Sequence, residues 1–210
     1  MFDNKQILKS KIFTKQIGVT LVELVVFMVI VSVALVGVLK VLDITNRGSA
    51  DPLIRKQAIS IAESLLLEVE QQPFTWCDPD DANASTATSA ASCVTTAQDP
   101  APTATGTMTG PFPSSESRYS SLDPFDNVAD YAGFSMPSAD CLGICSPGNS
   151  TPLAGLGAYT ATVTISRTGT VAPFTAFALD AVLKISVRVT GPANTDVTIT
   201  GYRVRYAPNI

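Results

Sequence analysis

The hydrophobic pattern of the chain begins with one long apolar segment. From Val19 to Leu39 the sequence is unbroken by charge except at Glu23. At about 1.5 Å per residue this segment would form a helix of roughly 31 Å, which matches the hydrocarbon thickness of a membrane. It is too long for the apolar part of a cleavable secretory signal, and no small-residue cleavage site follows it. The pattern therefore predicts a membrane-spanning helix over residues 19–42.

Helical spacing continues from Asp43 to Gln72, now with a single apolar face. Apolar residues recur at steps of three or four and so form a stripe along one side of the helix. The stripe consists of Ile54, Ala58, Ile61, Leu65 and Val69. Charged residues such as Glu68 lie outside it. Pro52 either starts a new helix or kinks a continuous one, and Pro73 disfavours continuation. We expect residues 43–76 to form an amphipathic second half of the helix that packs on a globular head.

The C-terminal region, residues 158–210, has the alternation of a β-sheet. Apolar and polar residues alternate over 159–166, 183–190 and 197–200, and the phase changes after Gly201, which predicts a bulge there. This reading places Arg203 and Arg205 on the solvent side. The alternation predicts an antiparallel sheet with one buried face. We therefore expect an α+β fold in which the long N-terminal helix packs on an antiparallel sheet.

Residues 77–157 form an acidic segment rich in Ser, Thr, Pro and Gly. Its single base, Arg118, stands against nine acids, whereas residues 158–210 hold five bases and two acids. The opposite charges suggest that this segment lies across the sheet. It also holds an even number of cysteines, which indicates disulfides in an exported protein. Of the three possible connectivities we favour the pairs that are near in sequence, Cys77–Cys93 and Cys141–Cys145.

The composition excludes several classes of function. The chain has no His, which removes Ser-His-Asp and Cys-His catalysis and His-ligated metals. A net charge of −4 without a basic patch argues against a nucleic-acid partner. The acidic turn of Asp78, Asp80, Asp81 and Asn83 suits Asx hydrogen bonding or calcium, but the Gly and terminal Glu of an EF-hand loop are missing. We therefore expect that the protein is not an enzyme and that it has no catalytic, cofactor-binding or metal-binding residues.

The N-terminus combines a basic leader, a glycine and a lone acid. Residues 1–18 carry four Lys against one Asp and end at Gly18, and Glu23 lies five residues further on. A carboxylate in a spanning helix costs roughly 2.5–3.5 kcal/mol at the helix centre and less near an end, so Glu23 requires compensation. A cut between Gly18 and Val19 would create an α-amine one helical turn away. The amine of one subunit would then neutralise Glu23 of the next.

This arrangement resembles the class III signal of type IV prepilins and type II secretion pseudopilins. The resemblance implies a leader of residues 1–18, cleavage after Gly18 by a prepilin peptidase, N-methylation of Val19, and a role for Glu23 in filament assembly. Val19 departs from the Phe or Met that is usual in the family. CDPDDANA and DNVADYAGFSM (126–136) also resemble minor pilins, including those of the mannose-sensitive haemagglutinin (MSHA) pilus.

The resemblance implies a minor pilin that primes or caps a type IV pilus. Such a protein would wait in the inner membrane of a Gram-negative bacterium, with its head in the periplasm, and then reach the cell surface in the pilus. Its partners would be major and minor pilins, the prepilin peptidase and the inner-membrane assembly platform. Two alternatives stay open: a type II secretion pseudopilin, and a pilus-tip adhesin subunit that uses its acidic loop as the contact surface.

Overall fold

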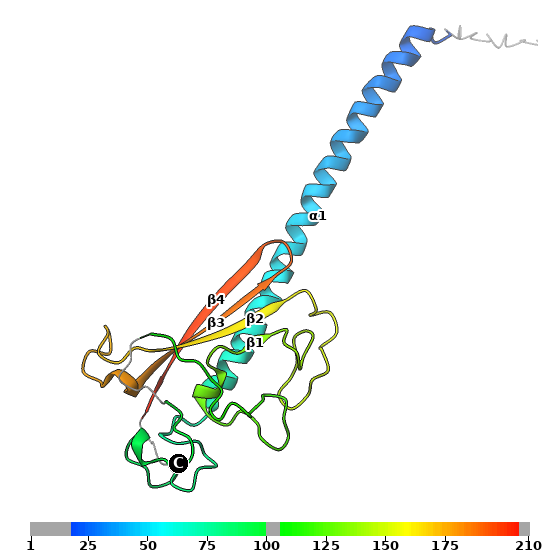
Figure 1. Ribbon diagram of the computed structural model, residues 1–210. Helices are drawn as coiled ribbons and strands as arrows, with labels where there is room; N and C mark the ends of the chain where they lie inside the picture. The colour runs from blue at the N-terminus through cyan, green and yellow to red at the C-terminus, as the bar shows by residue number, and fades with distance from the viewer. Residues whose placement is uncertain (1–17, 100–105, 206–210) are drawn as a thin grey trace, which may run out of the picture. The chain divides into compact units, whose positions relative to one another are not determined.

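A computed structural model describes residues 18–99 and 106–205, apart from the side chains of residues 44–51. The expected leader, up to residue 17, lies outside the described residues. The chain divides into two units, Met1–Gly48 and Ser49–Ile210. Helix α1, Leu21–Gln71, contributes to both units (Figure 1). It contains Pro52, so no separate helix begins there, and it ends two residues before Pro73.

The second part of α1 packs on the head through the expected stripe. Ala58, Leu65 and Val69 are buried, and Ile54 and Ile61 are partly buried against the same core. Their spacing of three and four residues keeps them on one side of the helix, so a single face of it meets the sheet. The stripe predicted from the sequence is confirmed.

The head contains a four-stranded antiparallel sheet in the order β1-β2-β3-β4. Its strands are β1 (Ser135–Met136), β2 (Thr160–Arg167), β3 (Val182–Gly191) and β4 (Thr195–Val204). The last three coincide with the alternating segments of the sequence. Strand β1 comes from the middle segment, where no strand is predicted, because two residues are too few to establish a period. Three short 3-10 helices complete the order, η1 (Ala90–Ser92), η2 (Val128–Tyr131) and η3 (Leu179–Ala181).

One face of the sheet is buried and the other is wet, as the alternation predicts. Val163 and Ile165 of β2, with Ile185 and Val187 of β3, are buried in the same cluster as the helix stripe. Thr164 lies between them on β2 and is exposed. The α+β layout is therefore a helix segment on one face of an antiparallel sheet.

Gly201 does not form a bulge, which corrects the sequence-based expectation. It pairs with Ile185 in an uninterrupted β3–β4 register. A Cβ atom at this position would lie 3.1 Å from Leu66 Cδ1 and still closer to the carboxylate of Glu70 on α1. The nearest atoms are the ends of flexible side chains, so the glycine leaves room for Leu66 and Glu70 of α1 beside the strand.

Arg203 and Arg205 do not face solvent, which is a second correction. Arg203 Nη2 donates to the carbonyl oxygen of Gln72 at 3.0 Å. The negative end of the helix dipole favours a cation at this place. Arg205 lies over the rings of Phe74 and Trp76, 4.1 and 3.8 Å from their centroids. These contacts bind the segment that follows α1 to the end of the sheet.

Arg205 also pairs with an acid of its own region. Its Nη1 atom lies 3.1 Å from Asp180 Oδ2, and its side chain is 3% exposed. Desolvation by burial lowers the pKa of the Arg205 guanidinium, and the Asp180 carboxylate opposes that effect. The guanidinium is therefore a buried cation held between aromatic rings and a carboxylate, rather than part of a basic outer surface.

A partly buried ion pair joins α1 to the middle segment. Arg118 donates from Nε to Glu68 Oε1 at 2.6 Å and from Nη2 to Glu68 Oε2 at 2.7 Å. Its Nη1 donates to the carbonyl oxygen of Cys145 at 2.8 Å, and Tyr131 donates its hydroxyl to Glu68 at 2.8 Å. Glu68 was expected on the polar side of the helix, but its side chain is only 16% exposed, because the middle segment covers it.

The acidic middle segment meets the bases of the head in discrete pairs. Arg167, at the end of β2, forms a bidentate pair with Asp99, and both side chains are buried. Arg188, on the exposed face of β3, pairs with Asp196 of the neighbouring strand instead. Of these two pairs only Arg167–Asp99 joins the acidic segment to a base of the sheet, so a layer of acidic segment across a basic sheet face is not what these contacts form.

We predict that Arg118→Met lowers the free energy of unfolding by about 3–5 kcal/mol, because it leaves a partly buried Glu68 without its cation. The control is Arg188→Met, which breaks an exposed pair and should leave stability nearly unchanged. Urea unfolding of the full chain in detergent micelles, followed by the fluorescence of Trp76, measures both. Equal losses for the two variants would contradict the central role of the Glu68–Arg118 pair.

Candidate functional site

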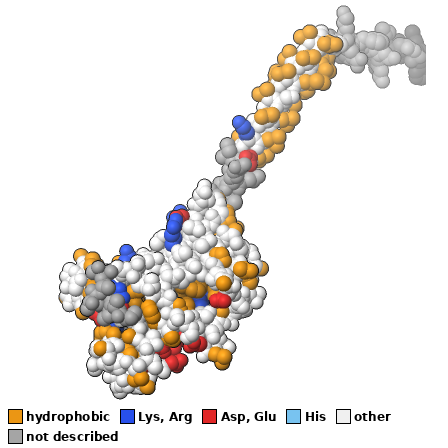
Figure 2. Space-filling view, in the orientation of Figure 1, with side chains coloured by type: hydrophobic (Ala, Val, Ile, Leu, Met, Phe, Trp, Pro, Cys, Tyr) orange, Lys and Arg blue, Asp and Glu red, His pale blue; other side chains and the backbone are white. Residues whose placement is uncertain are grey.

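The first part of α1 has apolar side chains that are exposed in the described part of the chain. Leu21–Asp43 is, among the described residues, the segment long and apolar enough to cross a membrane, and none of it is buried. Val19 is 70% exposed, Leu21 80% and Phe27 65%. Apolar side chains extend along this part of the helix in Figure 2. A helix that is apolar all round requires lipid or other apolar helices around it.

The sequence-predicted residues Gly18, Val19 and Glu23 lie together at the start of this helix. Gly18 and Val19 precede the helix and are exposed. Thr20 caps it, since its Oγ1 accepts the backbone N–H of Glu23 at 3.3 Å and its carbonyl oxygen accepts the N–H of Leu24 at 3.1 Å. The predicted cleavage junction therefore lies just before the helix, and Glu23 lies in its first turn.

Glu23 also lies at a position where a carboxylate can stabilise the start of its own helix. Thr20-x-x-Glu23 has the spacing of a capping box, in which a Glu three residues after the cap suits the first turn. The positive end of the helix dipole also favours a carboxylate there. Both effects stabilise the start of the helix. A test of any intermolecular role for Glu23 must therefore separate its charge from its capping geometry.

The four cysteines form the two disulfides favoured from the sequence, Cys77–Cys93 and Cys141–Cys145. The first closes a loop of the middle segment, and the second closes a short turn beside the Arg118 contact with Cys145. Both disulfides lie where regular secondary structure is sparse, so they restrict segments that the sheet does not hold.

Asp81 fixes the loop closed by the first disulfide. Its carboxylate accepts the backbone N–H groups of Asn83, Val94, Thr95 and Thr96, and the hydroxyl of Thr95, at 2.6–3.3 Å. These bonds, led by the N–H of Thr95, lower the pKa of the Asp81 carboxyl well below its usual range. Every donor stabilises the ionised form, so Asp81 serves the loop and is not a free catalytic or metal-binding acid.

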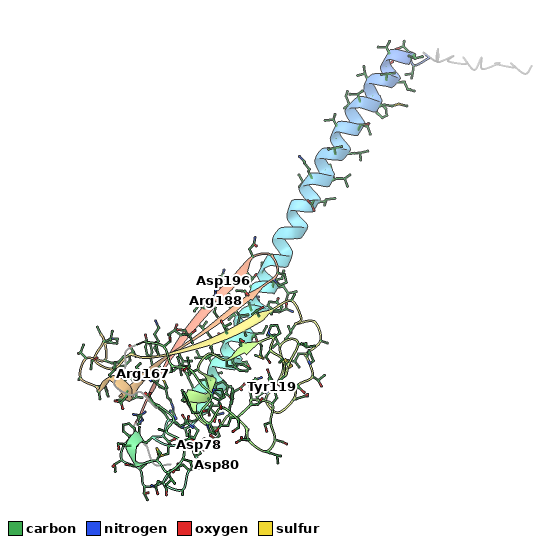
Figure 3. All side chains as sticks on the ribbon, in the orientation of Figure 1. Asp78, Asp80, Tyr119, Arg167, Arg188 and Asp196 are labelled. Atoms are coloured by element: carbon green, nitrogen blue, oxygen red, sulfur yellow. A yellow bond between two sulfur atoms is a disulfide. The ribbon has the colours of Figure 1, made fainter. Side chains whose placement is uncertain are left out.

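The other acids of the CDPDDAN turn have a different environment. Asp78 Oδ1 accepts the backbone N–H of Asp80 at 2.7 Å, an Asx bond of the kind expected. Asp78 and Asp80 then lie beside Asp126, which is remote in sequence. Figure 3 places the labelled Asp78 and Asp80 close together and far from the Arg188–Asp196 pair. This grouping is not predictable from sequence motifs, because the fold brings the residues together from separate loops.

The segment around Asn127 is a turn anchored by aromatic side chains. Asn127 and Asp130 form a capping box on η2, and Asn127 Nδ2 donates to Thr75 Oγ1 at 2.6 Å. Phe125, Tyr131 and Phe134 contact one another with ring centroids 5.0–6.1 Å apart. This rigid turn places Asp126 and Asp130 beside the loop that follows α1.

Comparisons of the chain with protein-family models, curated proteins and solved structures found no match. Two features of the molecule therefore indicate its function. The first is the uncovered apolar helix with Glu23 at its start, and the second is the head braced by disulfides and buried ion pairs.

We predict that Asp81→Asn destabilises the head by about 1–3 kcal/mol at neutral pH, because an amide nitrogen would face backbone N–H donors. The pKa of Asp81 is lower in the folded than in the unfolded chain, so the unfolded chain takes up the proton first as pH falls. The stability difference from wild type should therefore shrink between about pH 5 and pH 2.

The matched control is Asp140→Asn, at an exposed acid of the same segment, which should show no such pH-dependent difference. Urea unfolding in detergent at a series of pH values, with disulfides intact, provides the measurement. A constant difference across that range would show that the charge of Asp81 does not brace the loop.

Proposed function

We propose that this chain is a minor pilin of a type IV pilus, similar to minor pilin D of the MSHA pilus. The observation that carries the proposal is a carboxylate at the start of a wholly apolar helix that its own chain leaves uncovered, five residues after a glycine. An apolar surface of this length requires lipid before assembly and neighbouring helices afterwards. A filament built from many such helices supplies the second environment.

In this proposal, a prepilin peptidase cuts after Gly18 and the new amine of Val19 is methylated. The amine of one subunit then neutralises Glu23 of its neighbour, which fixes the axial stagger of the packed helices. The cost of a carboxylate in an apolar bundle is offset by an opposite charge at hydrogen-bonding distance. Major and minor pilins and an inner-membrane assembly platform are the proposed partners.

The head has the properties expected of a subunit exported from the inner membrane to a pilus. Its irregular middle segment is cross-linked by two disulfides, which persist in the periplasm and outside the cell. The long cysteine-containing segment favours a pilus head over a type II secretion pseudopilin, although the same N-terminus serves both.

We predict that the mature protein begins at N-methylated Val19, and that Gly18→Val leaves the leader in place. No atom outside its immediate chain neighbours lies within 4 Å of a Cβ built at Gly18, so the substitution tests recognition rather than folding. Gly37→Ala, at a glycine of the same helix that is also free of such contacts, is the matched control and should be processed normally. Mass spectrometry of the purified N-terminus reads the result, and a wild-type chain that begins at Met1 in a host with the peptidase contradicts the proposal.

We predict that Glu23→Gln is processed but is at least about tenfold depleted from filaments, because one lost ion pair of 1.4 kcal/mol already changes an equilibrium tenfold. Gln retains the hydrogen-bonding capacity of a capping box and enters a membrane more easily than Glu, so only the charge is tested. Thr20→Ala removes the cap and keeps the charge, and it should still be incorporated.

Sheared filaments and membrane fractions, probed for the mature protein, distinguish these variants. Normal incorporation of Glu23→Gln together with loss of Thr20→Ala would mean that Glu23 acts only in helix capping. Repeating the wild-type assay in strains that lack either the pilus or the secretion assembly ATPase separates the two filament systems.

A further inference from the structure

Five carboxylates from three separate loops converge in the head. Asp78, Asp80 and Asp126 each offer an oxygen within 4.8 Å of the others. Glu116, Asp126 and Asp130 form a second group with the same spacing. Asp126 belongs to both groups, so the two groups adjoin at this residue, between the loop after α1 and the turn of η2.

Several polar atoms of this region are buried without a partner. Glu116 is 6% exposed, yet its Oε2 has no hydrogen-bond donor among the described residues. Asp126 Oδ1 is likewise buried without a donor. Gln98, 1% exposed, donates from Nε2 to Asp78 Oδ2 at 3.3 Å, and its own Oε1 has no partner among the described residues. Buried oxygens are normally satisfied, so each of these atoms could accept a further partner.

Glu116 is aimed into the cluster rather than away from it. One of its carboxylate oxygens lies within 4.8 Å of one oxygen of Asp126 and one of Asp130. Burial first, then interactions with Asp78 and Asp130, raise the pKa of the Glu116 carboxyl. Burial and the surrounding acids, led by Asp78, raise the pKa of Asp126 to about 7. The middle segment holds one base, Arg118, and that base is paired with Glu68, so no cation of the segment neutralises the cluster.

We propose that this cluster, formed by Asp78, Asp80, Glu116, Asp126 and Asp130, binds Ca²⁺. Calcium takes six to eight oxygen ligands at about 2.3–2.6 Å, so oxygens around one ion lie no more than roughly 5 Å apart. The spacing of the two groups agrees with this geometry. A soft metal is disfavoured, because the chain has no His and its cysteines are in disulfides.

Calcium fits better than magnesium because the ligands come from irregular loops. Magnesium requires near-octahedral geometry and retains several waters, whereas calcium accepts varied carboxylate arrangements. Asp80 is exposed, so the region has access to solvent, while Glu116 and Asp130 form its buried side. The ion would join the loop after α1 to the η2 turn, and the inference does not depend on any role in a filament.

The test uses the full chain in detergent micelles, stripped of metal with EGTA and held at constant ionic strength. Trp76 is the single tryptophan and lies two residues before Asp78, so it can sensitise the luminescence of bound Tb³⁺. We expect Tb³⁺ luminescence that Ca²⁺ displaces at submillimolar to millimolar concentrations, the range of extracellular calcium modules. We also expect millimolar Ca²⁺ to raise the unfolding temperature, because the ion binds the folded chain.

Single substitutions should separate the site from general acidity. Asp80→Asn and Asp126→Asn should each weaken calcium binding by at least about tenfold, since affinity follows the charge count of the ligands. Asp140→Asn, at an exposed acid outside the cluster, should bind calcium as the wild type does. Glu116→Gln should unfold at the same or a higher temperature without calcium, because it removes a repelled carboxyl, and should gain nothing from added calcium.

Three results would overturn the assignment. One is a wild-type unfolding temperature that 10 mM Ca²⁺ leaves unchanged, with Tb³⁺ luminescence that Ca²⁺ does not displace. Another is wild-type calcium affinity in both Asp80→Asn and Asp126→Asn. The third is displacement of Tb³⁺ by Mg²⁺ at the same concentrations as Ca²⁺, which would replace calcium by a less selective cation site. Glu116→Gln keeps the test valid if other variants fold poorly.

Discussion

The ion pair between Glu68 and Arg118 is the contact on which the arrangement of the head depends. It connects α1 to a segment that contributes only a two-residue strand to the sheet. Tyr131 and the carbonyl oxygen of Cys145 complete the hydrogen bonds of the two charged groups. Because both charges have these additional partners, their removal from water is compensated. The irregular segment is thereby fixed to the helix, and the second disulfide is held at the same point.

The commitment of Arg118 to Glu68 has a consequence for the other acids of the middle segment. Asp99 is matched by Arg167, and Asp81 is satisfied by backbone donors. The cluster around Asp126 has no base from its own segment. A head that folds with such a cluster needs either bound protons or a bound cation, and a divalent cation neutralises more charge at neutral pH than the raised pKa of one or two carboxyls.

The N-terminal part of α1 requires different surroundings from the head. Most of its side chains are exposed and apolar. Thr20 caps its start and Glu23 lies in the first turn, whereas Lys40 and Asp43 lie at its far end. The head buries its apolar residues in its own core. The chain thus combines a head with its own core and a helix that requires apolar surroundings. A membrane, and later a bundle of similar helices, would provide these surroundings, which is the basis of the proposed pilin function.

The sequence by itself determined the elements whose side chains repeat: the apolar helix, its amphipathic continuation and the three long strands. It favoured the disulfide pairing between cysteines that are near in the chain, and the structure decided among the three possible connectivities. Tertiary structure alone decided the rest. Gly201 lies in an unbroken strand pair beside the side chains of α1 rather than in a bulge, and Arg203 donates to a carbonyl oxygen at the end of the helix. Likewise, Glu68 was buried and Asp78 was brought to Asp126 by contacts between remote segments, which leave no periodic signal in a sequence.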